Sequence, residues 1–242
     1  MSVEWRDRIH PNLENVTQRI TLAAERSGRS IEAIQIVAIS KGQPLEAIKA
    51  AIDLGLDHIG ENRVEEALHK QAQITQRDPT WHMVGHIQSR KAREIPNHFS
   101  WVHSIDRLTI AERLSRQATE QAGNLSVLLE CNVSGETSKG GWNLEDRSKW
   151  PTVTPEFQKI LALPAINVLG LMTMAPWVQD EKILRTTFQT LRELRDFLSK
   201  QLELELPHLS MGMSDDFEYA IEEGATMLRL GRAIFGPRQP KI

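Results

Sequence analysis

Short apolar runs alternate with longer segments of helical periodicity along the chain. The apolar runs are rich in β-branched residues and nearly continuous, which is typical of strands buried on both faces of a parallel sheet. The pattern predicts eight strands, at Ile36–Ser40, His58–Gly60, His82–His86, Trp101–Ser104, Val127–Asn132, Val168–Met174, His208–Met211 and Met227–Leu230. Helices are predicted before and between them, at 3–27, 44–56, 61–75, 88–97, 106–122, 154–162, 179–202 and 214–223.

The first predicted helix places Val16, Ile20, Ala23 and Ala24 on one stripe, and Pro11 lies near its first turns or interrupts it. Strand–helix alternation repeated eight times fits either an open doubly wound sheet or a closed (β/α)8 barrel. Eight units in 242 residues favour the barrel, which fills roughly 250 residues as one domain. We therefore predict an α/β TIM barrel with an extra N-terminal helix, as a single domain over residues 1–242.

The composition is that of an ordinary globular protein. Lys plus Arg number 29 and Asp plus Glu number 32, which gives a formal net charge of −3. This near-neutral balance argues against nucleic acid as a partner. The longest apolar run, Ile166–Pro176, is too short to span a membrane. A single cysteine, Cys131, fits a reducing compartment, and the charged N-terminus has no signal-peptide stretch, so we expect a cytoplasmic protein.

Polar residues and glycines gather where the predicted strands end, which is the face of a barrel where chemistry takes place. Lys41 directly follows the first strand. A lysine at a barrel mouth can form an imine with a carbonyl if desolvation or a nearby cation lowers its pKa from about 10.4. The competing interpretation is a solvated loop lysine, and position alone favours that interpretation.

The ends of the seventh and eighth strands have the residue types of a phosphate site. Ser210 and Ser214 supply hydroxyl groups, Gly212 and Gly231 allow backbone N–H groups to approach an anion, and Arg232 adds charge. A helix predicted to open at Ser214 would add its positive dipole end. Turn chemistry and helix capping are the alternative interpretation of the same residues.

Two carboxylates and one arginine refine this hypothesis. Asp215 and Asp216 would repel a phosphate that they faced, so we expect both to point away from it. An imine-forming lysine opposite a phosphate cradle suits pyridoxal 5′-phosphate (PLP). Arg229, near the end of the eighth strand, could then reach the pyridine nitrogen and leave it unprotonated, which weakens the ring as an electron sink. A structural ion pair inside the barrel is the alternative role for Arg229.

The same residues resemble the pyridoxal phosphate homeostasis protein family (YggS/PROSC, called PipY in cyanobacteria). The matching segments span almost the whole chain, in the family's order: Val37–Lys41, Gly60–Arg63, Trp81–Gly85, Gly170–Met172, Leu209–Asp215 and Arg229–Gly236. The resemblance implies a barrel of the alanine-racemase N-terminal type (fold type III) that carries PLP as an internal aldimine. It further implies a role in vitamin B6 and amino-acid homeostasis, without established catalysis.

The resemblance also assigns roles to individual residues. Lys41 would hold PLP covalently, Asn62 would lie beside the ring and Arg229 would face the pyridine nitrogen. The other expected cofactor-binding residues surround the phosphate or adjoin it: Ser210, Met211, Ser214, Gly231 and Arg232. The implied partners are PLP itself and apo-enzymes that accept it, and we expect a monomer.

The chain departs from the family pattern in two places. Gly42-Gln43 stands where many members have Thr-Lys, so the second lysine is missing, and Arg90 replaces an asparagine after the third strand. Both changes leave Lys41 in place, but they put in doubt any role of those two positions in handing the cofactor on. Lys139, in a glycine- and serine-rich stretch that we expect to be a long mobile loop, is either a secondary cofactor contact or a plain loop residue.

Two enzyme functions compete with the carrier hypothesis. An amino-acid racemase needs acid–base groups on both faces of the substrate carbon, and relatives of this fold bring a tyrosine from a second domain. The one tyrosine here, Tyr219, lies in a predicted helix whose stripe indicates packing, and eight units plus one helix use nearly all 242 residues. A Schiff-base aldolase would use Lys41 without the cofactor.

Other signals suggest structure more than function. His82 and His86 lie about 13 Å apart if both are on one strand, too far to share a metal ion. The stretch Gly135–Gly141 lacks the ending of a P-loop. Cys131 is expected to be a small core residue. Trp142 and Trp177 lie in predicted loops, where we expect loop packing rather than a position at the mouth.

Overall fold

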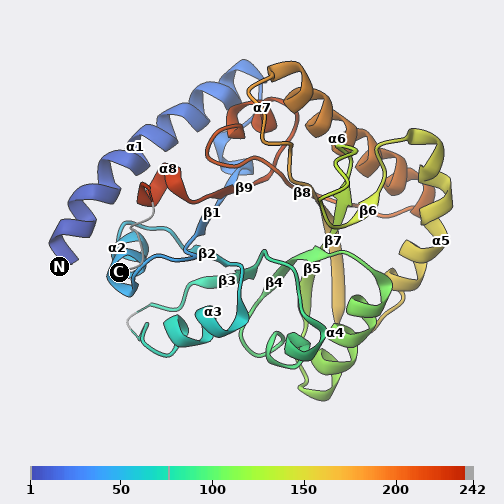
Figure 1. Cartoon of the computed structure of the whole chain (residues 1–242), viewed down its shortest axis with the longest axis horizontal. Coiled ribbons are helices and arrows are strands. Elements are labelled where there is room, and N and C mark those ends of the chain that lie inside the picture. Colours follow the sequence, from blue (N-terminus) through green and yellow to red (C-terminus); the bar gives the residue numbers. More distant parts are fainter. Residues whose placement is uncertain (1, 76, 238–242) are drawn as a thin grey trace.

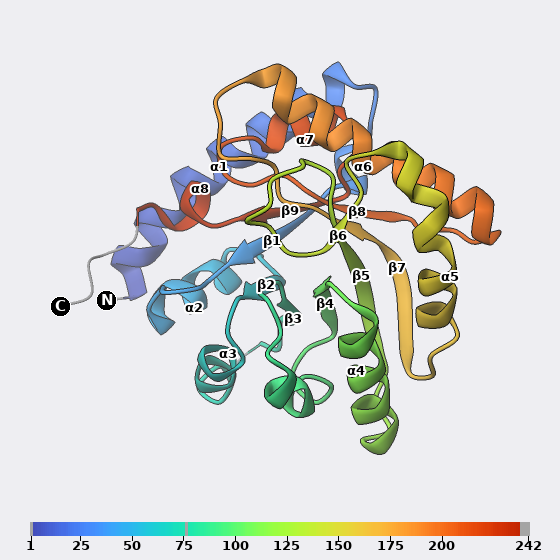
Figure 2. The ribbon, with the colours of Figure 1, turned by 45° about the vertical axis from the view of Figure 1, so that its right-hand side comes forward.

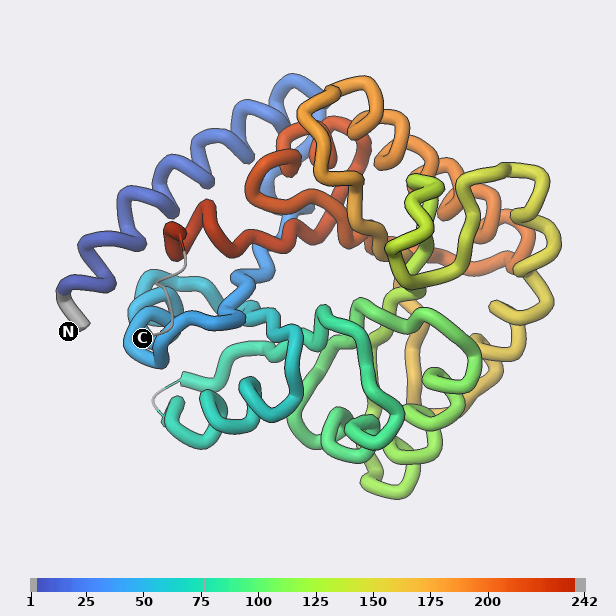
Figure 3. The backbone as a smooth tube through the Cα atoms, in the orientation of Figure 1, coloured from blue at the N-terminus to red at the C-terminus, as the bar shows by residue number. Residues whose placement is uncertain are grey.

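Eight parallel strands close into a barrel in a computed structural model that describes residues 2–75 and 77–237. Each strand pairs with its neighbours around the ring, and pairing between β4 and β5 closes it (Figures 1 and 3). The barrel strands are β1 (Gln35–Ile39), β2 (His58–Glu61), β3 (Thr80–Met83), β4 (Trp101–Ile105), β5 (Leu125–Asn132), β7 (Ile166–Met172), β8 (His208–Ser210) and β9 (Met227–Leu230). The predicted fold class is confirmed.

Helices surround the ring of strands on its outside (Figure 1). They are α1 (Ser2–Arg26), α2 (Leu45–Asp53), α3 (Val64–Gln71), α4 (Leu108–Glu120), α5 (Trp150–Leu161), α6 (Glu181–Leu202), α7 (Phe217–Glu222) and α8 (Arg232–Phe235). Short 3₁₀ helices occur at η1 (Ile31–Ala33), η2 (Ser89–Glu94) and η3 (Arg147–Lys149). In the described part of the chain, no helix combines the length and apolar character needed to cross a membrane.

Helix α1 covers the outside of the barrel against α2, α7 and α8. Its predicted apolar stripe is buried, since Val16, Ile20, Ala23 and Ala24 are at most 2% exposed. Pro11 lies inside the helix, which continues on both sides of it. The sequence pattern therefore predicted both the helix and the face that it buries.

Several element boundaries differ from the sequence predictions. Strand β3 ends at Met83, so His86 lies beyond it, and the helix predicted at 88–97 is the six-residue 3₁₀ helix η2. Pro96, which has no N–H to donate, follows η2 closely. Helix α7 begins only at Phe217, because the preceding residues form a turn in which Asp216 Oδ1 accepts a hydrogen bond from Met213 N–H. Helix α8 was not predicted.

The segment expected to be a long mobile loop contains a short strand, β6 (Trp142–Asn143), that pairs with the end of β5 (Figure 2). Gly141 adopts a left-handed φ of 93°, and a Cβ there would overlap the backbone of Glu130. The Asn132 amide donates to Glu136 O at 2.8 Å and to Asn143 Oδ1 at 3.0 Å. These contacts hold the segment against β5, and a two-residue strand carries no periodicity for the sequence to reveal.

Candidate active site at the barrel mouth

A cavity of about 710 Å³ opens at the C-terminal ends of the strands. Six predicted cofactor-binding residues line it together: Lys41, Asn62, Ser214, Arg229, Gly231 and Arg232. They come from the ends of β1, β2, β8 and β9, as the rule for barrel active sites predicts. The structure thus brings Lys41, Arg229 and residues that we expect at a phosphate to one cavity.

Ser210 and Met211 do not line this cavity, contrary to their expected place around a phosphate. Both are fully buried. Ser210 is the last residue of β8, and its side chain faces into the barrel, where its Oγ accepts a hydrogen bond from Arg229 Nη1 at 2.6 Å. Ser210 therefore supports a residue of the cavity and is not part of the cavity wall.

Arg229 forms the buried floor of the cavity, with a residue exposure of 6%. Besides Ser210, its guanidinium donates from Nη2 to Thr173 O at 2.8 Å. Burial lowers the pKa of Arg229 to about 10, against the opposing effect of Asp216 and Glu130, so the group stays cationic at neutral pH. Within residues 2–75 and 77–237, no ion pair to this arginine is found. The structure thus gives Arg229 two neutral acceptors in place of the structural ion pair that was the alternative interpretation.

The proposed phosphate wall carries both charges. Ser214 Oγ accepts from the N–H of Ala233 at 3.1 Å, and Arg232 forms an ion pair with Asp215. Asp215 and Asp216 both line the cavity, although we expected both to point away from a phosphate. Burial raises the pKa of the Asp216 carboxyl, and the N–H of Met213, at 2.5 Å, opposes this shift. The loop that follows β8 must turn tightly here, and this turn brings both carboxylates to the wall.

A buried polar network supports the turn that carries Lys41. Ser40 Oγ donates to Glu61 Oε1 at 2.6 Å, and Lys70 Nζ donates to Ser40 O at 2.7 Å. Gly42 has a left-handed φ of 70° and donates its N–H to Glu66 at 2.6 Å. The bonds fix the end of β1 to β2 and α3, and with it the root of the Lys41 side chain.

Of the two positions that depart from the family pattern, one lies in the cavity wall and the other lies outside it. Gln43, which stands where many members have the second lysine, lines the cavity. Arg90 lies in η2 and donates to Gln88 at 3.3 Å, outside the cavity wall. Lys139 donates to Met174 O at 2.8 Å and pairs with Glu136 at 2.7 Å. Lys139 is therefore held in place rather than projecting freely from a loop.

Aromatic residues show one correct and one wrong expectation. Trp142 lies in β6 rather than in a loop, and it packs edge-on against Phe157 with ring centroids 4.8 Å apart, outside the cavity wall. Trp177 instead lies at the cavity mouth and is 92% exposed. Tyr219 lies in α7 with the Arg185 guanidinium 4.8 Å from its ring centre, outside the cavity wall. Cys131 is buried in the core, as predicted.

The sequence did not reveal Glu130 as a buried carboxyl group near the strand ends. This residue, near the C-terminal end of β5, is 7% exposed, and its carboxylate lies beneath Gly140. Burial raises the pKa of Glu130 to about 7; Asp106 adds to the rise and Arg229 opposes it. The available signal was the one acidic residue of a mostly apolar strand, close to its C-terminal end.

The histidines also differ from a metal-site pattern. His82 is fully buried in β3, whereas His86 is exposed and pairs with Asp106 at 2.9 Å. Among the described residues, no cluster of histidine, cysteine and carboxylate side chains could hold a metal ion.

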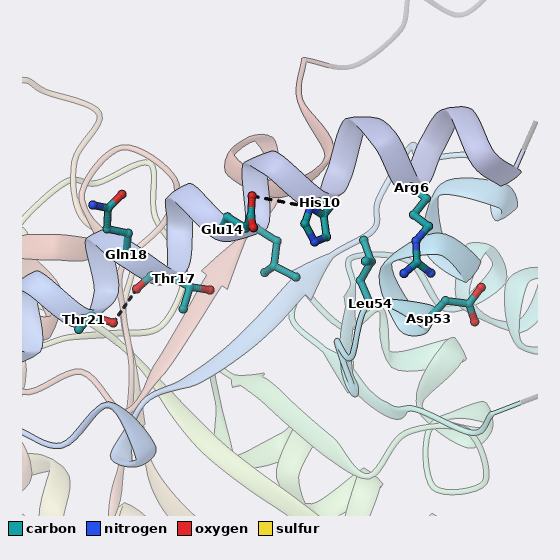
Figure 4. A pocket seen from close by; sticks show the side chains of 9 residues that line it. Arg6, His10, Glu14, Thr17, Gln18, Thr21, Asp53 and Leu54 are labelled. Atoms are coloured by element: carbon teal, nitrogen blue, oxygen red, sulfur yellow. Dashed lines mark hydrogen bonds and ion pairs between the residues drawn. The ribbon is translucent and has the colours of Figure 1, made fainter.

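A second cavity, of about 630 Å³, is a groove on the outer surface between α1 and the end of α2 (Figure 4). Arg6, His10, Glu14 and Asp53 project along it, and His10 pairs with Glu14 across one helical turn. The groove lies away from the strand ends and lacks the lysine–arginine combination of the mouth.

Comparison with known proteins finds one matching family model and relatives that are similar over almost the whole chain. Residues 12–239 match the family model for the alanine racemase N-terminal domain. A pyridoxal phosphate homeostasis protein of Pseudomonas aeruginosa is 43% identical over 95% of this chain and 96% of its own. PipY of Synechococcus elongatus, solved with PLP bound, is 37% identical with a TM-score of 0.78 over 91% of this chain and all of its own.

A more distant similarity shows the fold alone. An alanine racemase of Clostridium difficile superposes with a TM-score of 0.76 at 15% identity. The match covers 97% of this chain and 58% of the racemase chain. The barrel is thus the alanine-racemase type, as the sequence predicted.

Proposed function

Because the chain belongs to the pyridoxal phosphate homeostasis protein family, we propose that it binds PLP at the barrel mouth and serves the homeostasis of PLP and amino acids. The observation that carries this proposal is the presence of Lys41 and Arg229 in the wall of one cavity. The PLP seen in the related PipY structure supports it.

The residues of the cavity fit the cofactor. Lys41 would hold the aldehyde carbon through a covalent C=N bond, with the oxygen leaving as water. Arg229, tied at two nitrogens to neutral oxygens, keeps further N–H groups for the pyridine nitrogen. Asn62 would lie beside the ring. Ser214, Gly231 and Arg232 would surround the phosphate, with Ser210 and Met211 acting from behind this wall.

The bound cofactor supplies an electron-withdrawing ring, which an arginine partner leaves unprotonated and therefore weaker in that role. The carboxylates at the mouth are already engaged, since Asp215 pairs with Arg232. Tyr219 lies outside the cavity wall, and Asp216 already accepts a backbone hydrogen bond. We therefore propose a carrier of PLP, not an efficient enzyme, with apo-enzymes that need PLP as its acceptors.

Titration with PLP tests the binding proposal. The wild-type protein should turn yellow, and borohydride reduction followed by mass spectrometry should locate the adduct on Lys41. Lys41→Ala should abolish the absorbance, whereas Lys182→Ala, an exposed position on α6, should leave it unchanged. A protein that stays colourless with PLP, or an adduct at another lysine, overturns the proposal.

A second assay separates carriage from catalysis. The loaded protein should convert L-alanine to D-alanine no faster than free PLP and should restore activity to an apo-enzyme that lacks the cofactor. Racemisation at an enzyme-like rate, of about 1 s⁻¹ or more, contradicts the carrier proposal.

A further inference from the structure

A continuous series of hydrogen bonds crosses the barrel interior and ends at Arg229. We call this series, from His58 through His82, His103 and Ser210 to Arg229, the histidine relay. His58 Nδ1 lies 3.0 Å from His82 Nε2, and His82 Nδ1 lies 2.9 Å from His103 Nε2. His103 Nδ1 lies 2.8 Å from Ser210 Oγ, which accepts from Arg229. The histidines lie on the adjacent strands β2, β3 and β4, and the hydrogen bonds then cross the barrel to β8 and β9 (Figure 1).

Burial disfavours the charged form of all three imidazole rings. His82 and His103 are fully buried, and burial lowers the pKa of each well below its usual value. Burial also lowers the pKa of His58, with Asp57 opposing the shift. Trp101 stacks on His82 with ring centroids 5.8 Å apart and the ring planes 10° apart. A neutral imidazole has one N–H donor and one acceptor nitrogen.

The chemistry of Arg229 determines which group donates in each hydrogen bond of the relay. Because an arginine only donates, Ser210 Oγ must be the acceptor of the Arg229 bond. In the described part of the chain, the one remaining partner for the Ser210 hydrogen is His103 Nδ1. His103 therefore carries its hydrogen on Nε2 and donates to His82, which in turn donates from Nε2 to His58. The opposite direction leaves a buried hydroxyl hydrogen without an acceptor.

We propose that His103 and His82 are positioning residues. They orient the Ser210 hydroxyl so that its oxygen accepts the hydrogen bond from Arg229. The relay fixes one side of the guanidinium and Thr173 O fixes another, while Arg229 lines the cavity. This proposal rests on the proposed function only in naming the pyridine nitrogen as the acceptor of the remaining Arg229 N–H groups. The tautomers themselves are a property of the protein without cofactor.

Nitrogen NMR of the cofactor-free protein labelled at its histidine rings tests the tautomers directly. His82 and His103 should each show a protonated Nε2 and an unprotonated Nδ1 at neutral pH. A protonated Nδ1 on His103, or a doubly protonated ring at either position, overturns the relay. This measurement needs no variant and no PLP, so its outcome is independent of cofactor binding.

Two variants test the effect on the cofactor site. In His103→Asn the side-chain oxygen replaces Nδ1 as the acceptor for Ser210, so PLP affinity and absorbance should stay within about threefold of wild type. In His103→Leu this acceptor is lost, and affinity should fall about tenfold or more, with a shifted absorbance band. His69→Asn, on the exposed side of α3, serves as the control.

The outcomes separate the two proposals. Equal effects of His103→Asn and His103→Leu, or no effect of either, overturn the positioning role while PLP binding stands. Failure of the wild-type protein to bind PLP overturns the proposed function, and the NMR result still decides the relay. If His103→Leu does not fold, His103→Asn and the wild-type NMR carry the decision.

Discussion

Lys70 and Glu61 form a buried ion pair directly behind the strand end that carries Lys41. Lys70 reaches this position from α3 with only 6% of its side chain exposed, and Glu61 is fully buried at the end of β2. Each charge has further partners, since Lys70 also binds Glu66 at 2.8 Å and Glu61 also accepts from Ser40. A buried ion pair with its hydrogen bonds satisfied is costly to break from one side, because the other charge is left without compensation.

Lys70→Met should therefore destabilise the protein by about 3–5 kcal/mol. Urea denaturation followed by circular dichroism measures the change. Lys149→Met removes the exposed pair with Glu145 and should leave the midpoint unchanged. A similar small effect at Lys70 would show that the buried pair contributes no more than a surface one. PLP affinity should also fall in Lys70→Met, because the turn before Lys41 loses a hydrogen bond to Ser40 O.

Glu130 predicts a pH dependence of stability. Its pKa is raised from 4.5 to about 7 by burial in the folded state, so the folded protein binds the proton more tightly than the unfolded chain does. The stabilising effect of the protonated form is complete below about pH 4.5 and is lost as the pH rises through about 7.

Glu130→Gln should accordingly stabilise the protein relative to wild type at pH 8 by about 1–3 kcal/mol, and much less at pH 5. Urea midpoints at the two pH values give the comparison. A gain of equal size at both pH values would mean that packing, and not ionisation, causes the effect.

The sequence predicted the barrel because its signals are local and repeated. Strands such as Val127–Asn132 are nearly continuous apolar runs, and each is followed by a helical period, so the alternation survives small errors at the boundaries. Short elements escaped because two or four residues carry no period. Strand β6 depends on the close approach of Gly141 to Glu130, a contact between segments that the sequence alone does not show.

The candidate site was predictable as far as strand ends determine it. Lys41 and Arg229 follow from their places after β1 and within β9. The direction of side chains could not be predicted from the strand ends. The positions of Ser210 below the cavity and of Asp215 on its wall were therefore not foreseen. The three histidines of the relay come from adjacent strands, and their alignment becomes visible only once the register of those strands is known.

Asp215 should weaken binding of the cofactor phosphate. It lies on the cavity wall and engages Arg232, the cation expected at the phosphate. Asp215→Asn removes a negative charge and releases the arginine, so PLP and inorganic phosphate should both bind about three- to tenfold more tightly at low salt. Asp53→Asn, in the outer groove, is the matched control for a change of net charge. Weaker binding in Asp215→Asn would instead show that Asp215 orients Arg232 for the phosphate.

Gly85 lies against the backbone of Asn62, and a Cβ at this position would overlap the Asn62 carbonyl. The three atoms at the overlap, Asn62 O, Cα and C, all belong to the backbone, so a change of rotamer cannot relieve it. Ser104 Oγ holds Gly85 in place by donating to Gly85 O at 2.6 Å. Gly85→Ala should therefore displace Asn62 from the cavity wall.

The expected result of Gly85→Ala is a fall in PLP affinity of about tenfold, measured by absorbance titration, with a loss of stability of about 1–3 kcal/mol. Gly123→Ala is the matched control, because a Cβ there meets its nearest atoms at an ordinary 3.7 Å. Asn62→Ala, which removes the side chain without moving the backbone, separates the two causes. If Asn62→Ala loses as much affinity as Gly85→Ala, the side chain beside the ring accounts for the loss; if it loses little, the displaced strand end does.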